Sequence, residues 1–235
     1  WRCLVRPGKR FRLGSSVELA STRLCVRAVE DLGTRVVEFE EEPDLEREGL
    51  VPIPPYFERD ADAEDIVRYQ TVFAREEGSV AAPTAGLHFT PELLAQFPHT
   101  FVTLHVGIGT FQPVKTERLD EHRMHEEKFH ISESAAEALN AARRLVAIGT
   151  TVTRVLESQP PGPILAGPGS TSIFLRPPCT FQRVGALLTN FHLPRSTLLM
   201  LVSAFAGREL MREAYREAVA QRYRFFSYGD CMLIL

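Results

Sequence analysis

The sequence lacks the features that typify membrane-spanning and disulfide-bonded proteins. Its longest apolar run, residues 198–206, is interrupted by Ser203 and is far shorter than the roughly 20 residues that cross a bilayer, so we predict no membrane-spanning helix. The four cysteines are scattered without a CxxC pair, which favours reduced thiols in a cytoplasmic protein over disulfides. The first residues hold neither an initiator methionine nor a signal-peptide core, so we expect a chain that enters its fold partway.

Glycine-rich nucleotide motifs are also missing. No GxGxxG follows an apolar strand pattern and no GxxxxGK[ST] occurs, so neither a dinucleotide-binding fold nor a phosphate-binding loop is predicted. The segment Gly107-Ile108-Gly109-Thr110 is only GxGT, which more often ends a strand than cradles a phosphate.

Acidic residues are missing from one segment of the chain, although the chain as a whole contains both signs of charge. The net charge of -3 argues against a strongly cationic nucleic-acid binder but not against local basic patches. Residues 158–208 contain no acid, whereas residues 31–65 are strongly acidic. The acid-free span either faces a polyanion or forms a buried, strand-rich core with a few solvated arginines.

With 235 residues, 44% of them hydrophobic, the chain can form one or two domains with a substantial core. Residues 1–42 alternate apolar and polar positions between turn signals, which predicts a small antiparallel β-module. The acidic, proline-bearing stretch 40–55 indicates a boundary. The remainder predicts an α/β fold, a mixed or mainly parallel sheet with flanking helices. The expected helices are 65–75, 91–97, 132–144, 153–158, 196–206 and 209–221, and the expected strands are 100–106, 145–150, 172–176, 184–190, 223–226 and 231–235.

Four segments place a histidine among small or turn-forming residues: 81–89, 104–111, 122–126 and 189–194. Loops of α/β sheets gather at strand ends, where His88, His105 and His192 fall, so we expect a shared cleft. Taken alone, residues 81–89 are either a ligand-facing loop or a structural turn before the next helix.

His122 and His125 lie three residues apart, which would put both imidazoles on one face of a helix. A metal site would need a third ligand from another segment, and the HExxH pattern is absent. Acid–base or substrate-binding roles for at least one of the histidines are the favoured alternative.

Two further segments carry possible ligand contacts. Residues 149–157 lead from a strand into a helix whose first turn is rich in hydroxyls and could receive an anion; otherwise these threonines are only caps. Residues 223–230 interleave aromatics with an arginine before Asp230, which suits stacking on a nucleobase or plain core packing.

Taken together, these motifs resemble the S-adenosylmethionine:tRNA ribosyltransferase-isomerase family of queuosine biosynthesis. The segments that carry the resemblance span nearly the whole chain in the family's order, and residues 189–207 form its longest stretch. They are 69–73, 81–89, 103–111, 124–126, 149–157, 188–207 and 223–234.

The resemblance implies residues 1–45 as part of a β-barrel that is partly missing at its N-terminal side, and residues 46–235 as an α/β catalytic domain. It also implies transfer and isomerisation of the ribosyl part of S-adenosylmethionine onto 7-aminomethyl-7-deazaguanine at the tRNA wobble position. Epoxyqueuosine-tRNA forms, and adenine and methionine are released. The expected partners are the tRNA anticodon arm and S-adenosylmethionine, which is a substrate, so no cofactor is expected. A monomer is expected.

The site residues follow from mapping this chemistry onto the motifs. We predict acid–base roles for His88, His105 or His125, with Glu126 or Asp230 orienting one of them, and anion binding by Arg154 and Arg195. The predicted substrate-binding residues are Pro83, Thr84, Ala85, Gly86, Gly107, Gly109, Thr110, Thr150, Thr151, Arg154, Asn190, His192 and Arg195.

Three other function classes remain open at this point. A non-catalytic RNA-binding module would bind tRNA without regard to S-adenosylmethionine. A metal-dependent hydrolase would rely on His122 and His125. An ordinary S-adenosylmethionine methyltransferase has no glycine-rich loop to support it.

Overall fold

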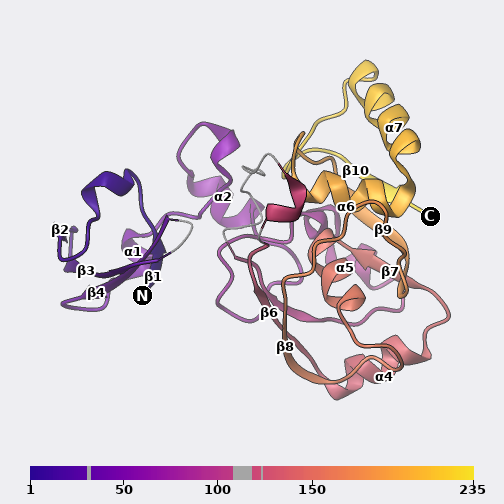
Figure 1. Cartoon of the computed structure of the whole chain (residues 1–235), viewed down its shortest axis with the longest axis horizontal. Helices are drawn as coiled ribbons and strands as arrows, with labels where there is room; N and C mark the ends of the chain where they lie inside the picture. The colour runs from indigo at the N-terminus through magenta and orange to yellow at the C-terminus, as the bar shows by residue number, and fades with distance from the viewer. Residues whose placement is uncertain (31–32, 108–117, 123) are drawn as a thin grey trace. The chain divides into compact units, whose positions relative to one another are not determined.

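The computed structural model describes the chain except for residues 31–32, 108–117 and 123. It forms two compact units, Trp1–Val51 and Pro52–Leu235 (Figure 1), whose division lies a few residues beyond the predicted boundary at residue 45. In the described ranges, no helix is both long and apolar enough to cross a membrane.

The first unit is a four-stranded antiparallel sheet. Its strands are β1 (Arg2–Leu4), β2 (Ser16–Glu18), β3 (Arg23–Val29) and β4 (Thr34–Phe39), in the order β1-β4-β3-β2. The period-two pattern buries Leu24, Val26 and Val37 as a small core, as expected for a sheet with one solvent-exposed face. The predicted small antiparallel β-module is confirmed, but the described strands do not close into a barrel. The short helix α1 (Leu45–Glu48) begins after Asp44, whose carboxylate accepts from the Arg47 backbone N–H.

The second unit contains two three-stranded sheets. One has the order β10-β9-β7 and is mixed, because β7 and β9 run parallel while β9 and β10 run antiparallel. The other has the order β5-β6-β8 and is antiparallel. The predicted mixed α/β fold is therefore confirmed, whereas a mainly parallel sheet is wrong for the described strands. The strand bounds are β5 Thr103–His105, β6 Glu127–Ile131, β7 Leu145–Ile148, β8 Gly167–Thr171, β9 Val184–Asn190 and β10 Cys231–Ile234.

Helix α5 (Thr150–Glu157) connects the two sheets through its packing. It follows β7 directly and contacts β7 and β9 of the mixed sheet as well as β8 of the antiparallel sheet. Because β7 and β9 are parallel neighbours, the end of β9 and the start of α5 lie at the same edge of the sheet. This edge positions the candidate site.

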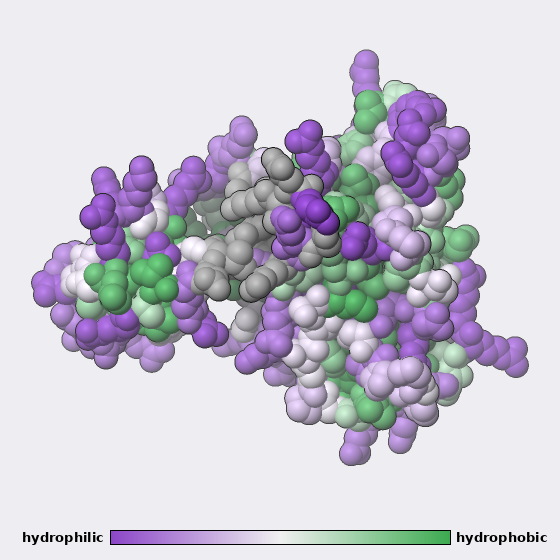
Figure 2. Space-filling view, in the orientation of Figure 1, coloured by the Kyte–Doolittle hydropathy of each residue, from purple (hydrophilic) through white to green (hydrophobic). Residues whose placement is uncertain are grey.

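Some of the other helices are shorter than the sequence predicts, and the rest match their predicted ranges closely. The α-helices are α2 (Ala63–Arg68), α3 (Pro91–Leu94), α4 (Glu133–Ala141), α6 (Thr197–Ala206) and α7 (Arg208–Ala220), and the 3-10 helices are η1 (Gly8–Arg10), η3 (Pro55–Phe57), η4 (Thr84–His88) and η6 (Leu119–Glu121). Helix α7 buries Met211 and Ala218 and carries hydrophilic side chains on the face visible in Figure 2.

Two predicted strands are wrong and two real ones were not predicted. Residues 172–176 and 223–226 form no strand; Phe226 adopts a left-handed φ of 72°, and the Asp230 carboxylate folds the segment back by accepting from the Arg224 backbone N–H. Strands β6 and β8 are the two that the pattern missed.

Candidate active site

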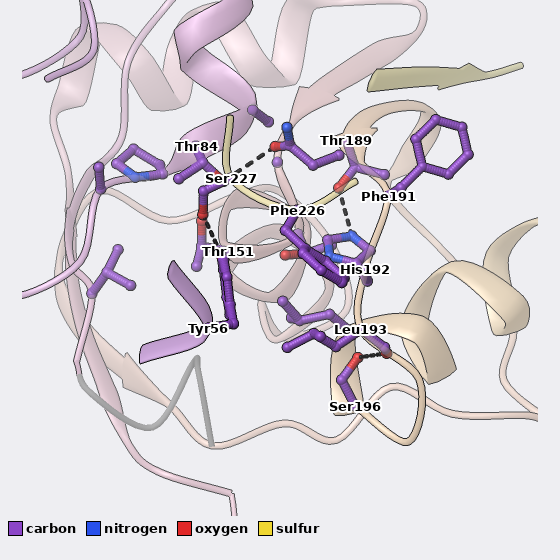
Figure 3. Close-up of a pocket in the computed structure, with 18 of the residues that line it drawn as sticks. Tyr56, Thr84, Thr151, Thr189, Phe191, His192, Leu193, Ser196, Phe226 and Ser227 are labelled. Carbon is purple, nitrogen blue, oxygen red and sulfur yellow. Dashed lines mark hydrogen bonds between the residues drawn. The ribbon is translucent and has the colours of Figure 1, made fainter. Parts of the chain in front are cut away.

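A pocket of about 330 Å³ opens at the edge where β9 ends and α5 begins (Figure 3). Its volume suits a small molecule, and all its described lining residues lie in the second unit. None of them is Asp, Glu, Lys or Arg, so a ligand meets hydroxyls, amides and apolar walls. Seven predicted binding residues line it: Pro83, Thr84, Ala85, Thr150, Thr151, Asn190 and His192.

Asn190, the last residue of β9, is held by two partners. The Thr84 hydroxyl donates to its Oδ1 over 3.2 Å, and its Nδ2 donates to His88 Nε2 over 2.9 Å. His88 then accepts at Nε2, so its neutral form carries the proton on Nδ1. Burial lowers the pKa of His88, and the negative charge of Asp230 opposes that shift. These contacts fix the amide of a side chain that is buried at the pocket wall.

His192 also lines the pocket and lies two residues after the end of β9. Its Nε2 lies 2.8 Å from the Thr189 Oγ1, and its backbone N–H donates to the Tyr215 hydroxyl over 2.7 Å. Burial lowers the pKa of His192 to about 4, so the ring is neutral near pH 7. It serves as a neutral hydrogen-bonding group of the wall.

Helix α5 contributes Thr150 and Thr151 from its first turn. Its N-cap is Gly149, whose φ of 98° belongs to the left-handed region that glycine tolerates, and no side chain caps the helix. Further along, Arg154 is only 4% exposed and pairs with buried Glu127 of β6. Its guanidinium therefore lies against a carboxylate and outside the described pocket lining, and the anion-binding role of Arg154 stays a prediction.

Two residues beside the pocket have left-handed backbones without being glycine. Phe226, with φ 72°, lines the pocket, and Arg195, with φ 57°, is exposed between the lining residues Pro194 and Ser196. Such conformations cost about 1–3 kcal/mol each and cluster at functional sites. They point to the same pocket as the hydrogen-bonded residues do.

Comparisons with known proteins agree over the whole chain. A family model described as queuosine biosynthesis protein matches residues 1–234. The chain belongs to this family. A Heliobacterium modesticaldum protein named S-adenosylmethionine:tRNA ribosyltransferase-isomerase is 51% identical over all of this chain and 74% of its own length. A Geobacter sulfurreducens protein of the same name is 52% identical over all of this chain and 73% of its own.

A solved structure supports the fold as well. The crystal structure of S-adenosylmethionine tRNA ribosyltransferase from Thermotoga maritima matches with a TM-score of 0.54 and 38% identity, covering all of this chain and 70% of that one.

Within this queuosine-family chain, several predicted residues lie outside the described pocket lining. Gly86 is packed against Phe73, whose ring would lie 2.8 Å from an added Cβ, and its substrate-binding role stays a prediction. His105 ends β5 in the other sheet, and Gly107 follows it. Gly109 and Thr110 lie outside the described residues.

The histidine pair is not on one helix face. His122 follows the 3-10 helix η6 and touches the ring of Phe174, and His125 lies in the extended segment before β6, so the predicted helical arrangement is wrong. Glu126 accepts from the Ser170 hydroxyl over 2.7 Å. In the described part of the chain, no three His, Cys, Asp or Glu side chains gather closely enough to hold one metal ion.

Sequence reasoning missed six polar or aromatic members of the lining. They are Tyr56, Thr189, Phe191, Ser196, Phe226 and Ser227. Tyr56 and Ser227 hydrogen-bond to each other across 171 positions of sequence, a pairing that no local pattern reveals. Phe226 and Ser227 belong to the aromatic run before Asp230, which was the available signal.

Proposed function

We propose that this chain is an S-adenosylmethionine:tRNA ribosyltransferase-isomerase, a tRNA-modifying transferase. The observation that carries the proposal is about 50% identity, over the entire chain, to proteins of that name. The proposed reaction moves the ribosyl part of S-adenosylmethionine onto 7-aminomethyl-7-deazaguanine at the tRNA wobble position. The products are epoxyqueuosine-tRNA, adenine and methionine.

The chemistry needs acid–base groups and a site that holds a nucleoside. The sulfonium makes the ribose 5′ carbon acidic, so that a base removes a proton there. Adenine departs, a bond forms to the modified base, and an epoxide closes as the carbon–sulfur bond breaks and methionine leaves. The pocket supports this role because hydroxyls and amides surround a volume of small-molecule size. S-adenosylmethionine is consumed as a substrate, and the proposal includes no cofactor.

The acid–base roles of His88, His105 and His125 remain proposals, as do orienting roles for Glu126 and Asp230. His88 has the clearest support, because it contacts the pocket residue Asn190 and because the negative charge of Asp230 acts to raise its pKa. Arg195, exposed beside the pocket, is proposed to hold a carboxylate or an RNA phosphate.

The test incubates the protein with S-adenosylmethionine and tRNA that carries the aminomethyl base. Mass spectrometry of the digested tRNA detects epoxyqueuosine, and chromatography measures adenine release. Transfer RNA with guanine at the wobble position is the matched control and yields neither product. Absence of epoxyqueuosine with the modified tRNA would contradict the proposal.

The same assay separates the rival functions. A non-catalytic RNA-binding module binds tRNA without producing adenine, and a metal-dependent hydrolase loses its activity to a chelator. Single His88→Gln, His105→Gln and His125→Gln variants identify the acid–base residues by their adenine-release rates. Wild-type rates in all three would remove these histidines from the mechanism.

The proposal also covers the fold of the first unit, the macromolecular partner and the oligomeric state. The antiparallel order β1-β4-β3-β2 supports a place for residues 1–45 in a β-barrel, as the resemblance implies. The anticodon arm of tRNA is the proposed macromolecular partner, which implies action in the cytoplasm. A monomer is proposed, and light scattering of the purified protein measures it.

A further inference from the structure

The hydroxyls around the pocket fall into two groups. The Thr84, Thr189 and Ser196 hydroxyls each hydrogen-bond within the protein, and the Tyr56 and Ser227 hydroxyls bond to each other. Thr150 and Thr151 differ, because their hydroxyls have no hydrogen-bond partner in the described part of the chain. Both residues line the pocket, with only 6% and 5% of their surface exposed. Two adjacent hydroxyls of the pocket lining are thus left for a ligand.

These two threonines form the first turn of α5, an eight-residue helix. The first amide N–H groups of a helix have no partner within it, and Gly149 supplies no capping side chain. The helix end carries a partial positive charge, so it favours an anion. An added Cβ at Gly149 would lie 3.8 Å from Thr151 Oγ1, so the bare glycine leaves the backbone beside this hydroxyl uncovered.

Among the described residues, no Asp, Glu, Lys or Arg lines this end of the pocket. The described lining contains no Lys or Arg, and the nearest guanidinium along α5, that of Arg154, pairs with Glu127. The described lining residues also include no carboxylate to repel an anion. Neutral donors at a helix N-terminus suit the carboxylate of an amino acid whose own ammonium balances the charge.

Building on the proposed function, we infer that the first turn of α5, with the Thr150 and Thr151 hydroxyls, binds the α-carboxylate of the methionine part of S-adenosylmethionine. Two hydroxyls beside helix amides match the two oxygens of a carboxylate. An RNA phosphate is the other source of an anion, but it carries a ribose on each side and needs an open groove. A pocket of about 330 Å³ fits the small substrate better.

The test compares two sulfonium ligands by calorimetric titration: S-adenosylmethionine and its decarboxylated form, which lacks only the carboxylate. Wild-type protein should bind S-adenosylmethionine about ten- to a hundredfold more tightly, because hydrogen bonds to a charged group are involved. Thr150→Val and Thr151→Val keep the side-chain shape. Each should weaken S-adenosylmethionine binding by about tenfold while leaving the affinity for the decarboxylated ligand unchanged.

Ser158→Ala is the matched control at the other end of α5. It removes one hydroxyl, which donates to the Val155 carbonyl, and it should leave both affinities at wild-type values. Thermal unfolding of each variant verifies that the fold is retained. The wild-type comparison of the two ligands needs no variant at all.

The outcomes separate this inference from the proposed function. Equal wild-type affinities for the two sulfonium ligands would overturn the carboxylate site, even where epoxyqueuosine is formed. Valine variants that weaken tRNA binding alone would assign the helix end to an RNA phosphate and also overturn it. Absence of epoxyqueuosine despite discrimination between the two ligands would count against the proposed function and not against the carboxylate site.

Discussion

The two ends of helix α5 treat buried polar groups in opposite ways. At its start, Thr150 and Thr151 face the pocket, and their hydroxyls have no partner among the described residues. Beyond the first turn, Arg154 pairs with Glu127, and Glu157 accepts backbone N–H groups from three consecutive residues before and at the start of β9. One helix therefore holds the fold together at one end and leaves bonding capacity open at the other.

The contrast helps to distinguish binding residues from structural ones. A buried polar group normally has a partner, because leaving one unmade costs about 1–3 kcal/mol. Arg154 has a charge partner inside the protein, because its guanidinium pairs with the Glu127 carboxylate. The Thr150 and Thr151 hydroxyls have no partner among the described residues, and both residues line the pocket, where a ligand can bond to them.

The largest effect is expected at the ion pair. Arg154→Met removes the guanidinium that pairs with the buried Glu127 carboxylate, and the free energy of unfolding should fall by about 3–5 kcal/mol. Urea unfolding followed by circular dichroism measures the loss. Arg154→Met combined with Glu127→Leu should recover most of it, and a loss below about 1 kcal/mol in the single variant would deny the pair its structural role.

A partnered residue of the pocket should make stability depend on pH. His192 has a pKa of about 4 in the folded chain against an ordinary value of 6.5, so the unfolded chain binds the proton more tightly. Stability should therefore fall by roughly 3 kcal/mol as the pH drops from 6.5 to 4. His192→Gln removes this contribution. Parallel urea titrations of the two proteins give the difference, and identical pH profiles would contradict the assignment.

A smaller effect is expected where α5 meets the start of β9. The Glu157 carboxylate accepts from the backbone N–H groups of Gln182, Arg183 and Val184 at 2.8 Å, 2.9 Å and 2.8 Å. Glu157→Ala should lower the free energy of unfolding by about 2 kcal/mol, since water replaces part of the lost bonding. Hydrogen exchange at these amides should accelerate. Glu157→Gln retains one acceptor oxygen and should lose less, and unchanged exchange would rule out this contact.

The smallest effect is expected at the open end. Thr150→Val removes a hydroxyl that bonds to nothing within the described protein, so the free energy of unfolding should stay within about 0.5 kcal/mol of wild type. Thermal unfolding without ligand measures it. A loss above about 2 kcal/mol would show that this hydroxyl is structural, which would erase the contrast between the two helix ends.

Local patterns were enough to predict the regular strands and to find several pocket segments. The alternation in residues 23–29 and the apolar run 184–190 became β3 and β9. β6 was missed because its buried face consists of Glu127, Phe129 and Ile131, and the charged first member hides the period of two. β8 was missed because glycine and proline are typical of turns, yet the ring of Phe129 lies over Gly169 and leaves no room for a side chain.

Pocket-lining residues were predicted where a local sequence pattern pointed to them. Thr84, Thr150 and Asn190 stand in turn-rich or strand-end segments and were found. Tyr56 follows a proline-rich boundary, and only the folded chain brings it to Ser227. The ion pair of Arg154 was not predicted because its partner Glu127 lies on a strand that the sequence pattern did not reveal.

The aromatic residues of the two units offer separate optical reporters. The chain has one tryptophan, Trp1, and its ring meets Phe39 edge-on within the first unit. The five tyrosines, at positions 56, 69, 215, 223 and 228, all belong to the second unit. Tryptophan emission excited at long wavelength therefore follows the small sheet, whereas tyrosine ellipticity in the near ultraviolet follows the pocket-bearing unit. A single denaturation experiment read at both signals can show whether the two units melt together.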